Sequence, residues 1–410
     1  MKNLWKKWTG TSLIIRIVLG LVIGSILGLC LPQFTGVSIL GSLFVGALKG
    51  IAPVLVFLLV VSALAKASQG TGSRFRTVIV IYLISTLLSA LIAVFANYMF
   101  PVTIKLSAAA SGSSPEGIAE VLRNVLNNVV SNPVKSIADA NYIGILFWAI
   151  ITGVCLKKLA TDKTVQSVTE FADSASMIVR AIIQFAPLGI CGLVFSSVSE
   201  SGLEIFTDYG KLVIILVSCM FFVALVVNPV IVFIFLRKNP YPLVFRCLRE
   251  SRITAFFTRS SAANIPVNMQ LCEKLGLEKD FYSVSIPLGA TVNMSGAAIT
   301  ITVMTLVVCN TLGISVDFGS ALILSILSTV AACGTSGVAG GSILLIPMAC
   351  SLFGIGNDVA MQAVAVGFII GVIQDSVETA LNSSSDVVFT TTAEFFEDLK
   401  KGKKISISGK

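Results

Sequence analysis

Long apolar runs separated by short polar segments dominate this chain. A helix that crosses the hydrocarbon core of a bilayer needs about 20 mainly apolar residues. The runs that meet this requirement are residues 12–31, 40–65, 77–100, 142–159, 177–198, 212–236, 282–309 and 361–389. The pattern therefore predicts an all-α polytopic membrane protein with eight transmembrane helices.

Two further apolar stretches, residues 242–275 and 321–353, do not fit as ordinary spans. The first has basic residues at both ends, so we expect a re-entrant helical hairpin that enters from the cytoplasm. The second has a glycine-rich centre, Cys333 to Ser342, which breaks a helix, so we expect a hairpin that enters from outside. The order hairpin, span, hairpin, span with opposite entry is typical of inverted repeats, whose broken helices meet near the bilayer midplane.

The distribution of basic residues gives the expected orientation. Clusters of lysine and arginine follow the second, fourth, sixth and eighth runs, whereas the segment after the first run has no charge and that after the fifth carries Glu200, Glu204 and Asp208. Cytoplasmic segments of membrane proteins are enriched in these residues. We therefore expect both termini to be cytoplasmic, with the long segment 101–141 outside. The same pattern accounts for the net charge of +8 without a nucleic-acid partner.

Composition excludes several classes of protein. Apolar residues make up 55% of the chain, charged residues 12%, and mean hydropathy is +0.93, which excludes an ordinary soluble enzyme. The absence of histidine excludes histidine acid–base chemistry and histidine metal ligands. Nine cysteines include no C-x-x-C pair, so we interpret them as free thiols that pack as small apolar groups. No phosphate-binding loop is present, which argues against a nucleotide-driven pump, and we expect no cofactor.

The last apolar run carries an unusual polar stripe. Asp375, Thr379, Asn382 and Asp386 are spaced i, i+4, i+7 and i+11, which places them on one face of a helix, with Glu378 at its edge. Each charged residue near the bilayer centre costs about 2.5–3.5 kcal/mol on insertion scales. No lysine or arginine occurs between residues 280 and 399. We therefore expect a bound cation, and an oxygen-only ligand set favours a hard ion such as Na⁺.

The seventh run has polar and small residues at its centre, between Gly289 and Ala297. One interpretation is that the helix unwinds there and frees carbonyl groups for an ion. The alternative is that the glycines pack against a neighbouring helix. The acidic stripe nearby favours the first interpretation.

The tip of the first hairpin contains one base, Arg259, between Thr258 and Ser260. Its side chain can reach the membrane middle and pair with Asp375 or Glu378, or it can extend to the interface. The free N–H groups at the start of the second arm suit the carboxylate of a substrate.

These motifs resemble those of the dicarboxylate/amino acid:cation symporter family, the glutamate-transporter homologues. Arg259-Ser260-Ser261, Asn293-Met294-x-Gly296, the glycine-rich second hairpin and the stripe from Asp375 to Asp386 occur in the family's order. The resemblance covers nearly the whole chain.

The resemblance implies roles for individual residues. Asp375 would hold the amino group of the substrate, and the rest of that site would comprise Ser260, Ser261, Met294, Val338, Thr379 and Asn382. One sodium site would comprise the Gly289 carbonyl, Asn293, Asn382 and Asp386. A second would use main chain around Thr291, Met294 and the second hairpin.

Two departures from the family pattern refine this expectation. Glu378 stands where members that take acidic substrates have an arginine, so the chain looks like the sodium-coupled serine/threonine branch. Ser295 stands where the family usually has an aspartate, which weakens a third sodium site shared with Ser85 and Thr86.

The resemblance also implies a homotrimer in the bacterial inner membrane that works by an elevator-type alternating-access mechanism. Residues 1–238 would mainly form the scaffold, with the third and sixth spans joining the transport domain. Residues 239–395 would form the core transport domain and 396–410 a basic cytoplasmic tail.

We expect import of serine and threonine with Na⁺, and the alternative is sodium- or proton-coupled transport of acidic amino acids or dicarboxylates. A channel and an intramembrane enzyme fit less well. Asp375 and Asp386 lie about 16 Å apart along one helix, which is too far for a carboxylate dyad.

Overall fold

The structure, a computed structural model, describes residues 11–66, 73–106, 126, 129–335, 340–403 and 405. These residues form helices and connecting segments, with no β-strand among them. Seven helical stretches in this part of the chain are long and apolar enough to cross a membrane. The fold class is therefore all-α, as the apolar runs predict.

One group of helices packs through very close backbone contacts. It comprises α2 (Leu13–Cys30), α3 (Ser38–Lys66), α7 (Tyr142–Leu159), α8 (Asp162–Gln184) and α9 (Ala186–Ser201). A Cβ atom added to Gly20 would lie 2.1 Å from the carbonyl oxygen of Pro187, and one added to Gly24 would lie 2.4 Å from that of Cys191. Small residues four positions apart therefore let the backbones of α2 and α9 meet, as is common between membrane helices.

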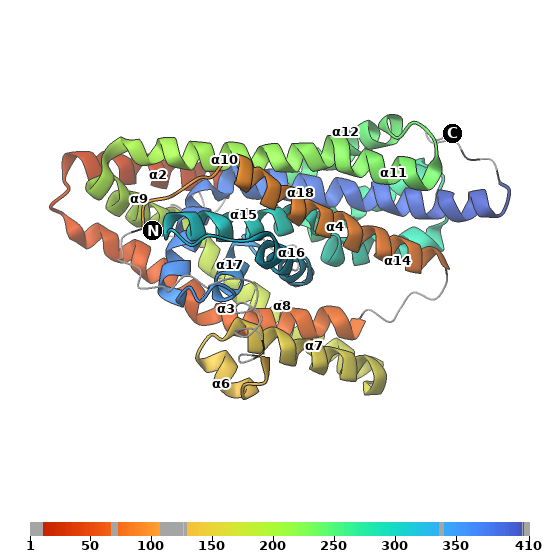
Figure 1. The fold of residues 1–410 in the computed structure, drawn as a ribbon, viewed down its shortest axis with the longest axis horizontal. Coiled ribbons are helices and arrows are strands. Elements are labelled where there is room, and N and C mark those ends of the chain that lie inside the picture. Colours follow the sequence, from red (N-terminus) through yellow and green to blue (C-terminus); the bar gives the residue numbers. More distant parts are fainter. Residues whose placement is uncertain are drawn as a thin grey trace.

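A second group surrounds a fully buried central helix. Residues 295–309 of α15 (Ser295–Thr311) are buried on every side, packed against α4 (Ser73–Met99), α16 (Phe318–Ala332) and α18 (Asn357–Lys400). The helices α10 (Ile205–Phe222) and α11 (Asn228–Leu236) run alongside α18 and are joined by a π-helical turn, η3 (Val223–Val227) (Figure 1).

Both predicted hairpin stretches interrupt their helices at the expected places. The first comprises α12 (Tyr241–Thr258) and α13 (Ser261–Lys274), separated at Arg259, whose φ of 50° ends α12 in the left-handed region. The second comprises α16, the 3₁₀ turn η4 (Ile343–Leu345) and the short α17 (Ile346–Ser351). The return arm of the second hairpin is thus short, a 3₁₀ turn followed by a six-residue helix with Pro347 in its first turn.

One sequence-based boundary was wrong. The predicted fifth span, residues 177–198, is not one helix, since α8 ends at Gln184 and α9 begins at Ala186 with a proline in its first turn. The apolar stretch Ala186–Leu236 is long enough for two crossings, and Gly202, with a φ of 66°, divides it into α9 and α10. About half of the expected external segment 101–141 lies outside the described residues, and the described part includes α6 (Pro133–Ala138).

Candidate substrate and cation site

The polar stripe of α18 is buried in the centre of the second helix group. Asp375, Thr379, Asn382 and Asp386 are each at most 5% exposed. The helix continues to Lys400, fourteen residues beyond Asp386. Asp386 is therefore an interior carboxylate rather than a solvated charge at a helix end.

The seventh apolar run unwinds where the sequence predicted it would. The helix α14 (Lys279–Val292) stops at Val292, and α15 starts at Ser295. Asn293 and Met294 between them have ψ angles of 77° and 49°, far from helical values. This break lies against α18, because the side-chain nitrogen of Asn293 is 2.9 Å from Oδ1 of Asp386.

Two buried oxygens at this break have no hydrogen-bond partner among the described residues. They are Oδ2 of Asp386 and Oδ1 of Asn293. Unpaired buried acceptors are rare in proteins and require a specific cause. A carboxylate and an amide oxygen that lack donors fit a hard cation such as Na⁺, which prefers oxygen ligands. The residues present therefore fit the predicted sodium site at Asp386 and Asn293.

Gly289 leaves open space beside the Asp386 carboxylate. A Cβ atom added there would lie 2.6 Å from Oδ1 of Asp386 and 2.8 Å from the hydroxyl of Tyr82. Tyr82 is fully buried and lies within hydrogen-bond distance of Thr390 and the main chain of Ser285. The sequence patterns gave no signal for Tyr82, because it is one aromatic residue in an apolar run.

We predict that Gly289→Ala raises the sodium concentration for half-saturation at least about tenfold, because the added methyl group displaces the Asp386 carboxylate. Sodium titration of the melting temperature of the purified protein measures this change. Gly210→Ala in α10 is the matched control, since a Cβ there meets no atom within 4 Å. Equal sodium responses in both variants would contradict the assignment of this space.

The amide of Asn382 is already engaged. Its Oδ1 accepts a hydrogen bond from the Gly296 amide at 2.7 Å, and its nitrogen lies 3.5 Å from the sulfur of Met294. Its main-chain oxygen lies 3.2 Å from the side-chain nitrogen of Asn293. Asn382 therefore orients the break between α14 and α15 through one lone pair of its side-chain oxygen, and the second lone pair of that oxygen leaves its predicted role as a sodium ligand open.

Arg259 lies beside Asp375 rather than Glu378. Its guanidinium nitrogen is 3.9 Å from Oδ2 of Asp375, and the residue is 8% exposed, so it does not extend to the interface. That carboxylate oxygen has no hydrogen-bond partner among the described residues. A cavity of about 20 Å³ touches Arg259, Asp375 and Gly340, which is room for about one water molecule.

Glu378 is held by neutral donors. Its Oε2 accepts from Thr300 at 2.7 Å, from Ser342 at 2.9 Å and from Gln374 at 2.5 Å. These donors come from α15, the second hairpin and α18, three elements that only the fold brings together. Glu378 therefore links the second hairpin to the core, and no described cation pairs with it.

The first hairpin presents its tip to α18. Ser260 caps α13 by accepting from the Ala263 amide at 3.2 Å, and Ser261 is buried. Deeper in the hairpin, the side-chain nitrogens of Asn264 and Asn268 donate to Ser383 of α18. The hairpin is thereby fixed next to the stripe. Val338, expected to supply main chain from the second hairpin, lies outside the described residues.

The residues of the weakened third sodium site form a neutral cluster. The Ser85 hydroxyl is 3.1 Å from that of Ser295 and 3.2 Å from Oδ1 of Asn228. The Thr86 hydroxyl donates to the main chain of Tyr82 at 2.8 Å. These groups partner one another and include no carboxylate. Asn228, which the sequence analysis missed, sits at the start of α11 after the π-helical turn.

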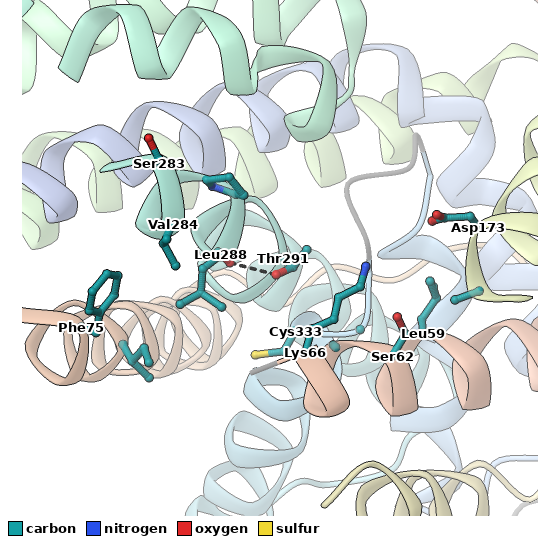
Figure 2. Close-up of a pocket in the computed structure, with 15 residues that line it drawn as sticks. Leu59, Ser62, Lys66, Phe75, Asp173, Ser283, Val284, Leu288, Thr291 and Cys333 are labelled. Carbon is teal, nitrogen blue, oxygen red and sulfur yellow. Dashed lines mark hydrogen bonds between the residues drawn. The ribbon is translucent and has the colours of Figure 1, made fainter. Parts of the chain in front are cut away.

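A larger cavity opens next to Thr291. It has a volume of about 290 Å³ and lies between α3, α8, α14 and the second hairpin. Thr291 and Cys333 line it, with the Thr291 hydroxyl donating to the main chain of Leu288 at 2.9 Å. Figure 2 shows the amino group of Lys66 pointing into this space, with Asp173 on a neighbouring wall. Lys66 forms no ion pair with any residue that the structure describes.

Comparison with known proteins agrees with this geometry. The sequence profile of the Sodium:dicarboxylate symporter family matches residues 13–395. The chain belongs to this family. It is therefore an integral membrane protein of a transporter family, and the enzyme alternative is set aside.

Several curated proteins align over nearly the whole chain. One from Bifidobacterium adolescentis is 56% identical over 97% of this chain and 93% of its own length. One from Streptococcus agalactiae is 58% identical over 96% of this chain and 98% of its own length. One from Streptococcus thermophilus is 55% identical over 96% of this chain and 98% of its own length. Each of these relatives is named serine/threonine transporter SstT.

Proposed function

We propose that this protein is a sodium-coupled symporter that imports serine and threonine. The observation that carries the proposal is a buried line of oxygen ligands on α18 in which Asp375 and Asp386 each retain an oxygen without a hydrogen-bond donor. The unpaired oxygen of Asp375 suits the ammonium group of an amino acid. That of Asp386 suits an alkali cation. The names of the close relatives support the same substrates.

The substrate would bind between the two hairpins and α18. Its ammonium group would replace the Arg259 guanidinium as the partner of Asp375, and its carboxylate would meet N–H groups at the start of α13. The space at Asp375 is about 20 Å³, so an amino acid requires the hairpin tips to separate. Thr379 and Asn382 would line the pocket beside Asp375.

Sodium would be coupled to the substrate through the break in the seventh run. Na⁺ at Asp386 and Asn293 would lie one helical turn from Asn382, which bonds to Gly296 at the start of α15. Binding of the ion would fix that break and so shape the substrate pocket. The membrane potential would contribute about 2.3 kcal/mol per charge per 100 mV to inward movement.

The elevator arrangement remains a proposal that the two helix groups support. The group of α2, α3 and α9 would be the scaffold of a homotrimer, and the group around α15 and α18 would move across the inner membrane. Eight crossings and two opposed hairpins would give both termini a cytoplasmic position. The carboxyl ends of α3, α11 and α18, near which basic residues cluster, lie toward the same side of the molecule, which agrees with this orientation (Figure 1).

The cavity that contains Lys66 would serve as the cytoplasmic passage. It separates α3 and α8 of the proposed scaffold from α14 and the second hairpin. It also touches Thr291, where main chain would form the second sodium site. The free ammonium group of Lys66 would attract the carboxylate of the departing amino acid.

Uptake by proteoliposomes tests the proposed function. Radiolabelled serine should accumulate when Na⁺ is outside, and excess threonine should inhibit this uptake. Equal accumulation in buffer with K⁺ only would disprove sodium coupling. Inhibition by aspartate or succinate but not by threonine would favour the alternative, a carrier of acidic amino acids or dicarboxylates.

The side chain at position 378 should determine whether the protein prefers neutral or acidic substrates. We predict that Glu378→Arg raises the affinity for aspartate relative to serine at least about tenfold, because it adds a cation beside the substrate pocket. Competition against serine binding measures this ratio. Glu378→Gln is the control, since it keeps the shape and hydrogen bonding of the side chain and should leave the ratio within about twofold. An unchanged ratio in Glu378→Arg would contradict the assigned role.

A further inference from the structure

A second large groove lies on the outer side of the first hairpin. It has a volume of about 630 Å³ and is bounded by α10, α12 and α18. Its apolar walls include Phe221, Phe245 and Phe256. Its floor is formed by Val377, Ala380 and Leu381, which lie on the back of α18, away from the Asp375 stripe.

Among the residues that the structure describes, two arginines are the only charged ones in this lining. Arg249 and Arg252 are exposed and lie three residues apart on one face of α12. Neither forms an ion pair with a residue that the structure describes. The neighbouring Arg246 differs, because its guanidinium lies 3.2 Å from Glu250. The groove thus combines an apolar channel with two unneutralised positive charges.

The surroundings of the groove indicate contact with lipid rather than water. Phe245, Ile253 and Phe257 of α12 are exposed by 55%, 56% and 68%. In a chain that spans a membrane, such a surface faces acyl chains. Glu250, the acid nearest in sequence, points to Arg246 and Lys274 instead of the groove.

The depth of the arginines matches a lipid headgroup. Arg249 and Arg252 precede the hairpin tip at Arg259 by ten and seven residues, which is about 15 and 10 Å along a helix. Half of the hydrocarbon core is about 15 Å thick. With the tip near the bilayer midplane, as the inverted-repeat pattern predicts, Arg249 lies at the cytoplasmic edge of the hydrocarbon core, and the side chains of Arg249 and Arg252 can extend to the phosphates.

We propose that this groove is a binding site for one anionic phospholipid of the cytoplasmic leaflet. The phosphate would bind Arg249 and Arg252, and an acyl chain would lie against the phenylalanines and the back of α18. Charge complementarity selects this occupant, because a zwitterionic lipid brings a cation next to two unpaired arginines. The groove is separate from the substrate pocket. A negative result in the lipid-binding experiment would therefore leave the proposed transport function untouched.

Native mass spectrometry of the purified full-length protein tests this site. The protein is titrated with phosphatidylglycerol or, for comparison, with phosphatidylcholine of the same acyl chains. We expect the first bound phosphatidylglycerol to be retained at least about tenfold more strongly than phosphatidylcholine, and Arg249→Gln with Arg252→Gln to remove this preference. Arg249→Lys with Arg252→Lys should retain most of it, which separates loss of charge from misfolding.

The matched control removes the same charge elsewhere. Arg76 and Arg237 are exposed and lie next to the ends of α4 and α11, outside the groove, so their replacement by glutamine should change retention less than about twofold. Soluble glycerol phosphate should not compete, since it has no acyl chain. The proposal would be overturned by an equal loss of phosphatidylglycerol retention in both glutamine double variants. Effective competition by glycerol phosphate, or binding of a second copy of the chain instead of lipid, would also overturn it.

Discussion

Replacing Asp375 by asparagine should weaken serine binding at least about 100-fold. Asp375 is buried, and its Oδ2 is the one carboxylate oxygen near the hairpin tips that lacks a hydrogen-bond donor among the described residues. Truncating one partner of a buried charge pair costs about 2–5 kcal/mol, which corresponds to roughly 30- to several thousand-fold in affinity. Equilibrium binding of labelled serine at saturating Na⁺ measures the loss.

Asp358→Asn is the control for this experiment. Asp358 lies at the start of the same helix, is highly exposed and pairs with Lys49, so the same change there should leave serine binding within about twofold. The melting temperature of each variant checks the fold, because Asp375→Asn also leaves Arg259 without its ion partner. Serine binding that survives in Asp375→Asn would show that the ammonium group binds elsewhere.

Replacing Asp386 by asparagine should weaken sodium binding and leave the serine pocket itself intact. Asp386 supplies the carboxylate of the proposed ion site, and Asn293 supplies the other unpaired oxygen. Loss of a buried charge partner of this kind should raise the sodium concentration for half-saturation at least about 30-fold. Sodium dependence of serine uptake in proteoliposomes, measured at fixed serine, gives this value.

Asn293→Ala separates the two contributions to the sodium site. It removes the neutral amide oxygen and keeps the carboxylate, so the sodium requirement should rise by a smaller factor than in Asp386→Asn. A larger effect of Asn293→Ala would mean that the main role of this asparagine is to position the break through its contacts with Ser385 and Asn382.

The site elements that periodicity encodes were predictable from the sequence. The stripe from Asp375 to Asp386 follows from helical spacing within one apolar run, and the break after Val292 follows from small and polar residues at its centre. The interruption of the first hairpin at Arg259 follows from the polar tip between two half-length arms. In each case the signal lies within about fifteen neighbouring residues.

The partners of these residues were not predictable, because they come from distant parts of the chain. Glu378 receives hydrogen bonds from Thr300 and Ser342, which belong to other elements. Tyr82 reaches Ser285 across about 200 residues. Packing also decides that the side-chain oxygen of Asn382 accepts a hydrogen bond from the Gly296 amide. The division of 177–198 at Phe185 was missed because the apolar pattern continues across the boundary between α8 and α9.

The dependence of serine affinity on sodium concentration is the most direct test of the transport mechanism. For the purified protein in a membrane mimetic, the dissociation constant of serine should fall steeply as Na⁺ replaces K⁺ at constant ionic strength. In Asp386→Asn the same titration should give a flat line over that range. A serine affinity that is equal in Na⁺ and K⁺ for the unaltered protein would contradict the coupling of the two sites on α18.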